Sequence, residues 1–158
     1  MITLIAAIGK NRELGKDNKL IWYIPDDLKF FRKTTTDHTV VMGYNTYKSI
    51  GKALPNRKNI VITTKDIEID GAVVYHNIDD MLKKEMTNDE VFIIGGASLY
   101  KHFYPIASKM YLTEIDDEDK EADVYFPEFD EGDWDREILF ENKDNEVKYK
   151  HVLYKRKK

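Results

Sequence analysis

The chain has 158 residues, 42% of them hydrophobic, and a formal net charge of −4. That length predicts one domain with a sizeable core, and the hydrophobic share excludes an intrinsically disordered chain. The mixed charge argues against nucleic-acid binding, because the basic residues cluster only in the terminal segment 155–158. The absence of cysteine excludes a disulfide framework and a thiolate zinc site.

The first residues, Ile2–Ile8, form an almost continuous apolar run, which predicts a central strand covered on both faces. No basic segment precedes this run, and it is too short to span a bilayer. We therefore expect a cytoplasmic protein with no membrane segment. A polar, glycine-containing loop follows at 9–18, and its composition fits a mobile lid and a plain connection equally well.

A helix is predicted to begin at Pro25, because proline suits the first helical position. Leu28 and Phe31 share one face of this helix, and Asp27 lies on the same face. An apolar environment should raise the pKa of Asp27 and demand a polar partner. Asp27 is thus either a helix-start acid or the ionisable group of a ligand pocket. Trp22 favours the pocket, because its N–H can orient a water beside a buried acid.

The rest of the chain alternates between strands and helices. Strands are predicted at 39–42, 58–64, 72–75, 90–94 and 109–115, and helices at 45–50, 78–84 and 97–104. Two closing strands, 134–140 and 146–154, are joined by a turn at 142–145 into a hairpin. This order predicts a single α/β domain over 1–158, with a central, mostly parallel sheet, helices on both faces and a C-terminal antiparallel hairpin.

Ligands of such sheets bind beyond the carboxyl ends of the strands. Gly43 and the pair Gly95–Gly96 stand there, each just before a predicted helix, where backbone N–H groups suit a phosphate. Glycine is also common in tight turns, so a structural role explains each equally well. The chain contains neither a Gly-x-Gly-x-x-Gly fingerprint nor a Gly-Lys-Ser/Thr phosphate loop.

Arg57 lies in a turn-rich connection, where it is either a solvated base or a bidentate clamp for a ligand carboxylate. Thr113 lies inside an apolar strand, and its hydroxyl either pairs locally or bonds Asp27. The chain has four histidines: His38, His76, His102 and His151. Their spacing is not typical of a metal site, so we predict no metal and interpret them as surface or core residues.

Over essentially its whole length the chain resembles bacterial-type dihydrofolate reductases. The matching pieces are Ile5–Ala7, Gly15, Leu20-x-Trp22, Asp27-Leu28-x-x-Phe31, Val41–Gly43, Thr46-Tyr47-x-Ser49-Ile50-Gly51, Leu54-Pro55-x-Arg57, Ile94–Gly96, Tyr100, Tyr111–Thr113 and Phe126-Pro127. The resemblance implies hydride transfer from NADPH to C6 of 7,8-dihydrofolate, with protonation at N5, giving 5,6,7,8-tetrahydrofolate.

The resemblance also implies roles for individual residues. Asp27 would bind the pterin's 2-amino group and ring nitrogen and promote protonation of N5 through water, with Thr113 as its partner and Trp22 helping to hold the water. The implied substrate-binding residues are Ile5, Ala7, Asp27, Leu28, Phe31, Arg32, Ile50, Lys52, Leu54, Arg57, Ile94 and Thr113. Arg57 would clamp the α-carboxylate of the glutamate tail, with Arg32 and Lys52 near its outer end.

The implied NADPH-binding residues are Ala7, Gly15, Leu20, Gly43, Tyr44, Thr46, Thr63, Thr64, Lys65, Gly95, Gly96, Ala97, Ser98, Leu99 and Tyr100. Thr46 would lie at a phosphate, and in the family the Gly95–Gly96 peptide is cis. Residues 9–23 would form a mobile loop over the nicotinamide. Asp123 would hold that loop from the neighbouring acidic loop.

The chain departs from the family pattern at several positions, among them Ile21, Tyr44 and Ala122, which stands where a glycine is common. Ile21 stands where the family usually has proline, which loosens the backbone before Trp22. Tyr44 stands where an arginine often contacts the phosphate that distinguishes NADPH from NADH. Lys65, or more weakly His76, would have to supply that charge, and without it the preference for NADPH should be weak.

The resemblance further implies a monomer that binds dihydrofolate and antifolate inhibitors such as diaminopyrimidines. Two other interpretations stay open at this point. One is a reductase of another pterin-like substrate, and the other is a non-catalytic folate- or nucleotide-binding module of the same fold.

Overall fold

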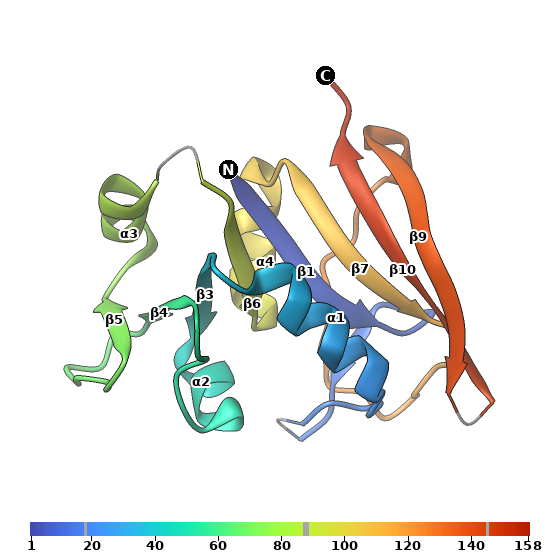
Figure 1. Cartoon of the computed structure of the whole chain (residues 1–158), viewed down its shortest axis with the longest axis horizontal. Coiled ribbons are helices and arrows are strands. Elements are labelled where there is room, and N and C mark those ends of the chain that lie inside the picture. The colour runs from blue at the N-terminus through green and yellow to red at the C-terminus, as the bar shows by residue number, and fades with distance from the viewer. Residues whose placement is uncertain (18, 87–88, 145) are drawn as a thin grey trace.

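The computed structural model describes residues 1–17, 19–86, 89–144 and 146–158 (Figure 1). Its main feature is an eight-stranded sheet in the order β5-β4-β3-β6-β1-β7-β10-β9. The strands are β1 (Ile2–Ile8), β3 (Thr39–Gly43), β4 (Lys58–Ile62), β5 (Ala72–Tyr75), β6 (Val91–Gly95), β7 (Lys109–Ile115), β9 (Trp134–Asp144) and β10 (Val147–Arg156). All neighbours from β5 to β7 pair in parallel, whereas β10 is antiparallel to both β7 and β9. The predicted mostly parallel sheet with a closing antiparallel hairpin is confirmed.

Helices cover both faces of this sheet. They are α1 (Pro25–Thr35), α2 (Tyr44–Ile50), α3 (Ile78–Glu85) and α4 (Ala97–Phe103), followed by the short 3-10 turns η1 (Tyr104–Ile106) and η2 (Glu131–Asp133). Figure 1 shows α1 in front of the central part of the sheet and α4 behind it. None of the described helices is long and apolar enough to cross a membrane.

The apolar run of β1 supplies side chains to both layers of the core. Leu4 belongs to the cluster that contains Phe103 of α4, whereas Ile5 belongs to the cluster against which Phe30 and Phe31 of α1 pack. Successive residues of a strand point to opposite faces, so a strand covered on both faces is apolar at almost every position, and in β1 only Thr3 is polar. The predicted central position of this strand is therefore confirmed.

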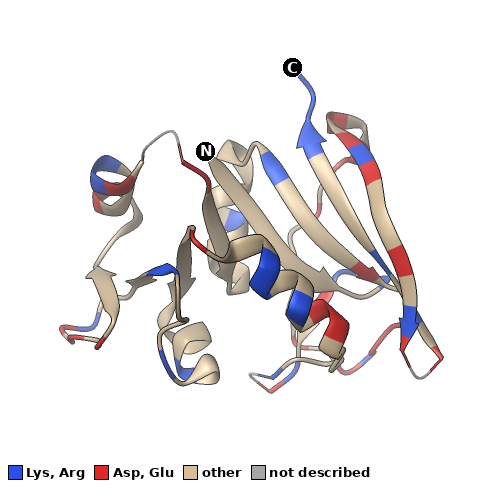
Figure 2. Cartoon of the chain, viewed as in Figure 1, with Lys and Arg blue, Asp and Glu red and all other residues tan. Residues whose placement is uncertain are grey.

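Helix α1 begins as its sequence predicts. Pro25 occupies the first turn, Asp26 and Asp27 follow there, and Arg32 and Lys33 lie in the last turn. This distribution matches the helix dipole, which favours carboxylates at the N-terminus and cations at the C-terminus. Figure 2 shows the same separation of charge along α1.

Two predictions about connections are wrong. β2 (Glu13–Gly15) pairs with β8 (Val124–Tyr125) in a small antiparallel sheet, although residues 9–18 were expected to form a loop and no strand was predicted at 124–125. Such short segments carry no alternation that a sequence pattern can detect. In addition, β9 continues to Asp144, so residues 141–144 extend a strand predicted to end at 140, and 142–144 had been expected in the turn. The other turn residue, Asn145, lies outside the described residues, as does Asn18 of the predicted 9–18 loop.

Candidate active site

The first turn of α1 directs Asp27 toward the sheet. Its side chain is 21% exposed, and its Oδ1 accepts a hydrogen bond of 2.5 Å from Oγ1 of Thr113 on β7. Burial raises the pKa of Asp27, and the hydrogen bond from Thr113 acts in the opposite direction. Of the two possibilities for the Thr113 hydroxyl, a local bond or a bond to Asp27, the structure shows the second.

Asp27 faces a row of residues that runs across three strands. Ala7 of β1 pairs with Thr113 of β7, which pairs in turn with His151 of β10. Ile5 lies two residues before Ala7 and therefore points to the same face of the sheet. Thus α1 and the sheet together bring an acid, a hydroxyl and small apolar side chains to one place.

The predicted substrate residues divide into buried and exposed groups. Phe31, Leu54 and Ile94 pack against the cluster that includes Ile5. Leu28 and Ile50 are each 37% exposed, although the spacing on α1 predicted that Leu28 would look inward. Exposed apolar side chains such as these suit the face of a flat heterocycle.

Arg57 is held against the C-terminal end of α1. Its Nε donates to the carbonyl of Pro55 at 2.9 Å, and its Nη1 donates to Oγ1 of Thr35 at 3.1 Å. Burial and the nearby charge of Arg32 lower the pKa of Arg57. Within the described part of the chain, neither arginine forms an ion pair. Two neighbouring guanidinium groups without a carboxylate partner suit an anionic ligand. Lys52, predicted beside them, is exposed.

On the other side of the candidate site, the Gly95–Gly96 peptide is cis and Gly95 has a φ of +134°. A Cβ at Gly95 would lie 3.1 Å from Oγ1 of Thr46, the α2 residue predicted at a phosphate. The side chain of Thr46 therefore limits the space beside Gly95. Gly43 and Ala97 are half-buried, and Ser98 is exposed.

Two of the predicted cofactor residues belong to the core. Leu99 and Tyr100 are buried, and the Tyr100 hydroxyl donates to the carbonyl of Ile5 at 2.7 Å. The backbone N–H of Tyr100 also donates to the carbonyl of Gly96 at 3.0 Å. Their predicted position along NADPH stays a prediction.

Two lysines approach the ring of Tyr44. Nζ of Lys65 is 5.4 Å from its ring centroid, and Nζ of Lys48 is 5.3 Å away. The sequence predicted Lys65 as the replacement for the missing arginine but did not single out Lys48. His76 Nδ1 lies 2.9 Å from the carbonyl of Thr63, a buried residue, whereas Thr64 is exposed. Positive charge is therefore present around Tyr44 without an arginine at that position.

The predicted role of Trp22 needs correction. Its Nε1–H donates to Oδ2 of Asp117 at 3.0 Å. An indole has a single N–H donor, so in this conformation it has none left to orient a water beside Asp27. Trp22 instead ties the segment that follows β1 to the acidic loop that follows β7.

Further contacts hold these two segments together. Oδ2 of Asp123 accepts from the N–H of Asp17 at 2.9 Å, the contact that the resemblance predicted. The buried Glu13 accepts from the N–H groups of Asn11 and Asp119, both at 2.7 Å. Gly15 is part of the β2–β8 sheet, and the predicted cofactor residue Leu20 is 63% exposed. The segment is thus anchored to the acidic loop by several hydrogen bonds.

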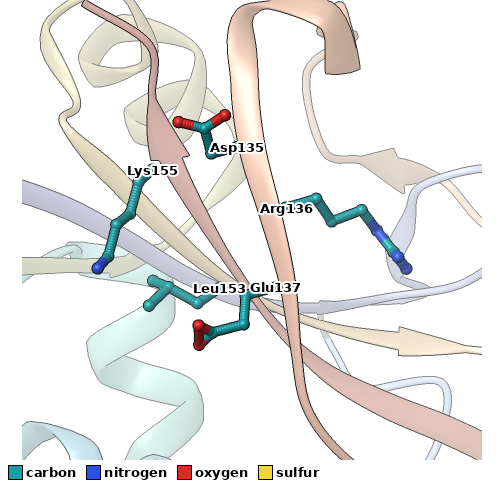
Figure 3. A pocket seen from close by; sticks show the side chains of 5 residues that line it. All are labelled: Asp135, Arg136, Glu137, Leu153 and Lys155. Carbon is teal, nitrogen blue, oxygen red and sulfur yellow. The ribbon is translucent and has the colours of Figure 1, made fainter.

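Two surface hollows lie away from these residues. One, of about 360 Å³, lies between β9 and β10 and is lined by Asp135, Arg136, Glu137, Leu153 and Lys155 (Figure 3). The other, of about 510 Å³, is lined by residues of α1 and of the neighbouring strands, among them Asp26, Phe30 and Phe140. Neither contains a predicted site residue, and the described residues contain no group of three side chains able to hold a metal.

A sequence model of the dihydrofolate reductase family matches residues 1–157. The chain belongs to the dihydrofolate reductase family. The dihydrofolate reductase of Bacillus subtilis (strain 168) is 45% identical over 128 residues, which cover 80% of this chain and 76% of that protein. The Haemophilus influenzae dihydrofolate reductase is 39% identical over 125 residues, covering 79% and 78%.

A solved structure shows the same relation. The Enterococcus faecalis dihydrofolate reductase, complexed with NADP(H) and RAB-propyl, has a TM-score of 0.90 and 30% identity, covering 100% of this chain and 97% of that chain. The family expected from the sequence motifs is confirmed. Its reaction, the NADPH-dependent reduction of dihydrofolate, is therefore the activity of this chain.

Proposed function

We propose that the chain reduces 7,8-dihydrofolate with Asp27 as the residue that binds the pterin ring and promotes protonation of N5. The observation that supports this role is the carboxyl itself, largely buried and bonded to Thr113. Because burial raises its pKa, the group holds a proton closer to neutral pH than an exposed aspartate does. Its hydrogen bond to Thr113 fixes the orientation of the carboxyl.

NADPH, when bound, supplies the hydride for C6. The residues around Gly95–Gly96 fit such a group, because Thr46 offers a hydroxyl beside two residues without side chains. Lys48 and Lys65 fit the extra phosphate of NADPH, because both ammonium groups lie close to the Tyr44 ring, where they can bind an anion. In this proposal these cations replace the family's arginine and maintain a preference for NADPH over NADH.

Arg57 and Arg32 are proposed to bind the glutamate tail of the substrate. Arg57 is already oriented by Pro55 and Thr35, so little side-chain freedom remains to be lost on binding. Diaminopyrimidine antifolates should occupy the pterin position, because their amino groups can donate to the Asp27 carboxylate. The single domain, the monomeric state and the cytoplasmic location remain predictions.

Substrate comparison tests the proposal. NADPH oxidation by the purified protein is measured with dihydrofolate and, separately, with a dihydropterin that lacks the benzoylglutamate tail. We expect a much higher kcat/KM for dihydrofolate, since only this substrate reaches Arg57. Equal values would favour a reductase of another pterin. Binding of dihydrofolate without any NADPH oxidation would favour a non-catalytic module and would contradict the proposal.

A further inference from the structure

A buried histidine lies beside the proposed acid, and the mechanism above does not use it. His151 of β10 is completely buried, with its Nδ1 3.0 Å from Oγ1 of Thr113. The same nitrogen lies 3.8 Å from Oδ1 of Asp27. The ring is stacked on Phe30 at 4.2 Å and packed against Phe140 at 4.5 Å, measured between centroids. Its position is therefore closely fixed.

The hydrogen-bonding capacity of Thr113 decides which atom carries the proton. Its hydroxyl has one hydrogen to donate, and it lies between Oδ1 of Asp27 and Nδ1 of His151. An ionised Asp27 can only accept, so the hydroxyl must donate to the carboxylate. Nδ1 of His151 must then be the protonated nitrogen and donate to Oγ1. The three groups form a directed chain from His151 through Thr113 to Asp27.

The other ring nitrogen of His151, Nε2, is buried and lacks a hydrogen-bond partner among the described residues. Oδ2 of Asp26 is the nearest charged atom on that side, at 3.8 Å, and it already accepts from the Tyr149 hydroxyl at 2.9 Å. A buried polar atom without a partner destabilises a fold. A phenylalanine would fill the same stack without that penalty, so packing alone does not account for a histidine here.

The groups that face the ring determine its charge. Asp26 and Asp27 face it from α1 and Tyr149 from its own strand, whereas Thr113 of β7 and Phe140 of β9 bring no charge. Burial lowers the pKa of His151, while the two carboxylates oppose that effect. The imidazole is therefore neutral near neutral pH, and it carries the single proton that the chain to Asp27 requires.

We propose that His151 is a positioning residue for the reaction: its Nδ1–H donates to the Thr113 hydroxyl, commits that hydroxyl to Asp27 and thereby favours the ionised carboxylate. This inference deepens the proposed function and rests on it for the role of Asp27. His151 touches neither the pterin nor NADPH in this account. It acts on the reaction only by setting the pH range over which Asp27 holds its proton.

The test is a titration of the Asp27 carboxyl by carbon-13 NMR in the free protein. His151→Phe keeps the aromatic stack and removes the N–H donor, so the titration midpoint should rise by about 0.5–1 pH unit, the effect of one hydrogen bond. His151→Asn places an amide N–H near the position of Nδ1 and should return the midpoint toward the wild-type value. His102→Phe makes the same change at an exposed histidine of α4 and should leave it unmoved.

A second variant tests whether His151 acts on Asp27 through the hydroxyl of Thr113. In a Thr113→Val background, His151→Phe should cause no further rise, because the hydroxyl that links the two side chains is gone. An unmoved midpoint in His151→Phe, an equal rise in His151→Asn, or a rise that persists without Thr113 would each overturn the proposal. His151→Leu also lacks the donor and replaces His151→Phe if that variant does not fold. The titration needs no turnover, so failure here is distinct from failure to reduce dihydrofolate.

Discussion

Replacing Thr113 with valine tests how the fold controls the proposed acid. Valine has nearly the same shape but cannot donate, so Asp27 loses the 2.5 Å hydrogen bond to its Oδ1. A hydrogen bond to a charged group contributes about 1.5–3 kcal/mol, and about 1.4 kcal/mol corresponds to one pH unit. Since the Asp27 side chain is only 21% exposed, most of that effect should be retained. The pH midpoint of hydride transfer should therefore rise by about 1–2 units.

The same substitution should change the pH dependence of stability. Because burial raises the pKa of Asp27, its contribution to stability is greatest in acid and is lost as the pH rises through the folded-state pKa. Thr113→Val raises that pKa further, so the variant should lose more stability at neutral pH than in acid. Stopped-flow hydride transfer and denaturant unfolding across pH measure the two effects.

Thr3→Val is the matched control. Thr3 is also buried, and its hydroxyl donates to a carboxylate, Glu90, at 2.6 Å, but it is not part of the candidate site. It should lose stability without a change in the pH midpoint of hydride transfer. A midpoint in Thr113→Val that stays in place or moves down would refute the reasoning.

Three further substitutions test the substrate and cofactor contacts. Arg57→Met should raise the KM for dihydrofolate by about 10- to 100-fold with little change in kcat, because a charge-assisted contact is lost; an unchanged KM in steady-state assays would exclude the clamp. Lys65→Met should weaken the binding of NADPH by about 10-fold and leave the binding of NADH unchanged, whereas Tyr44→Arg should strengthen the binding of NADPH. Fluorescence titration measures both affinities, and equal effects on NADPH and NADH would contradict the role of these residues. Gly95→Ala places a Cβ at a φ of +134° and 3.1 Å from Oγ1 of Thr46, so it should lower stability by about 1–3 kcal/mol; denaturant unfolding identical to the wild type would contradict this.

Much of the architecture could be predicted from local patterns. The continuous apolar run 2–8 identified a strand covered on both faces, and the spacing of Asp27 and Phe31 directed the carboxyl toward the sheet. The same spacing overstated the burial of Leu28, which is 37% exposed. Periodicity shows which face turns inward, but it does not show whether a neighbouring element covers that face.

The missed features depend on contacts between distant segments. Trp22 and Asp117 are 95 positions apart, and no local pattern indicates that the indole N–H ends on that carboxylate. His151 meets Thr113 only through the register of β10 on β7. A single histidine in a strand has no spacing signal, so the sequence could not distinguish it from an ordinary core residue.

The central claim, that Asp27 promotes protonation of the substrate, is tested most directly by the rate of hydride transfer in Asp27→Asn across pH. Asparagine keeps the shape of the side chain but cannot hold the proton. Asp79→Asn makes the same change at an exposed acid in the first turn of α3 and should retain the wild-type rate. We predict that Asp27→Asn is at least about 100-fold slower at neutral pH, the lower range for loss of a general acid, and recovers as the solvent itself protonates N5 in acid. A neutral-pH rate close to that of the wild type would contradict the account.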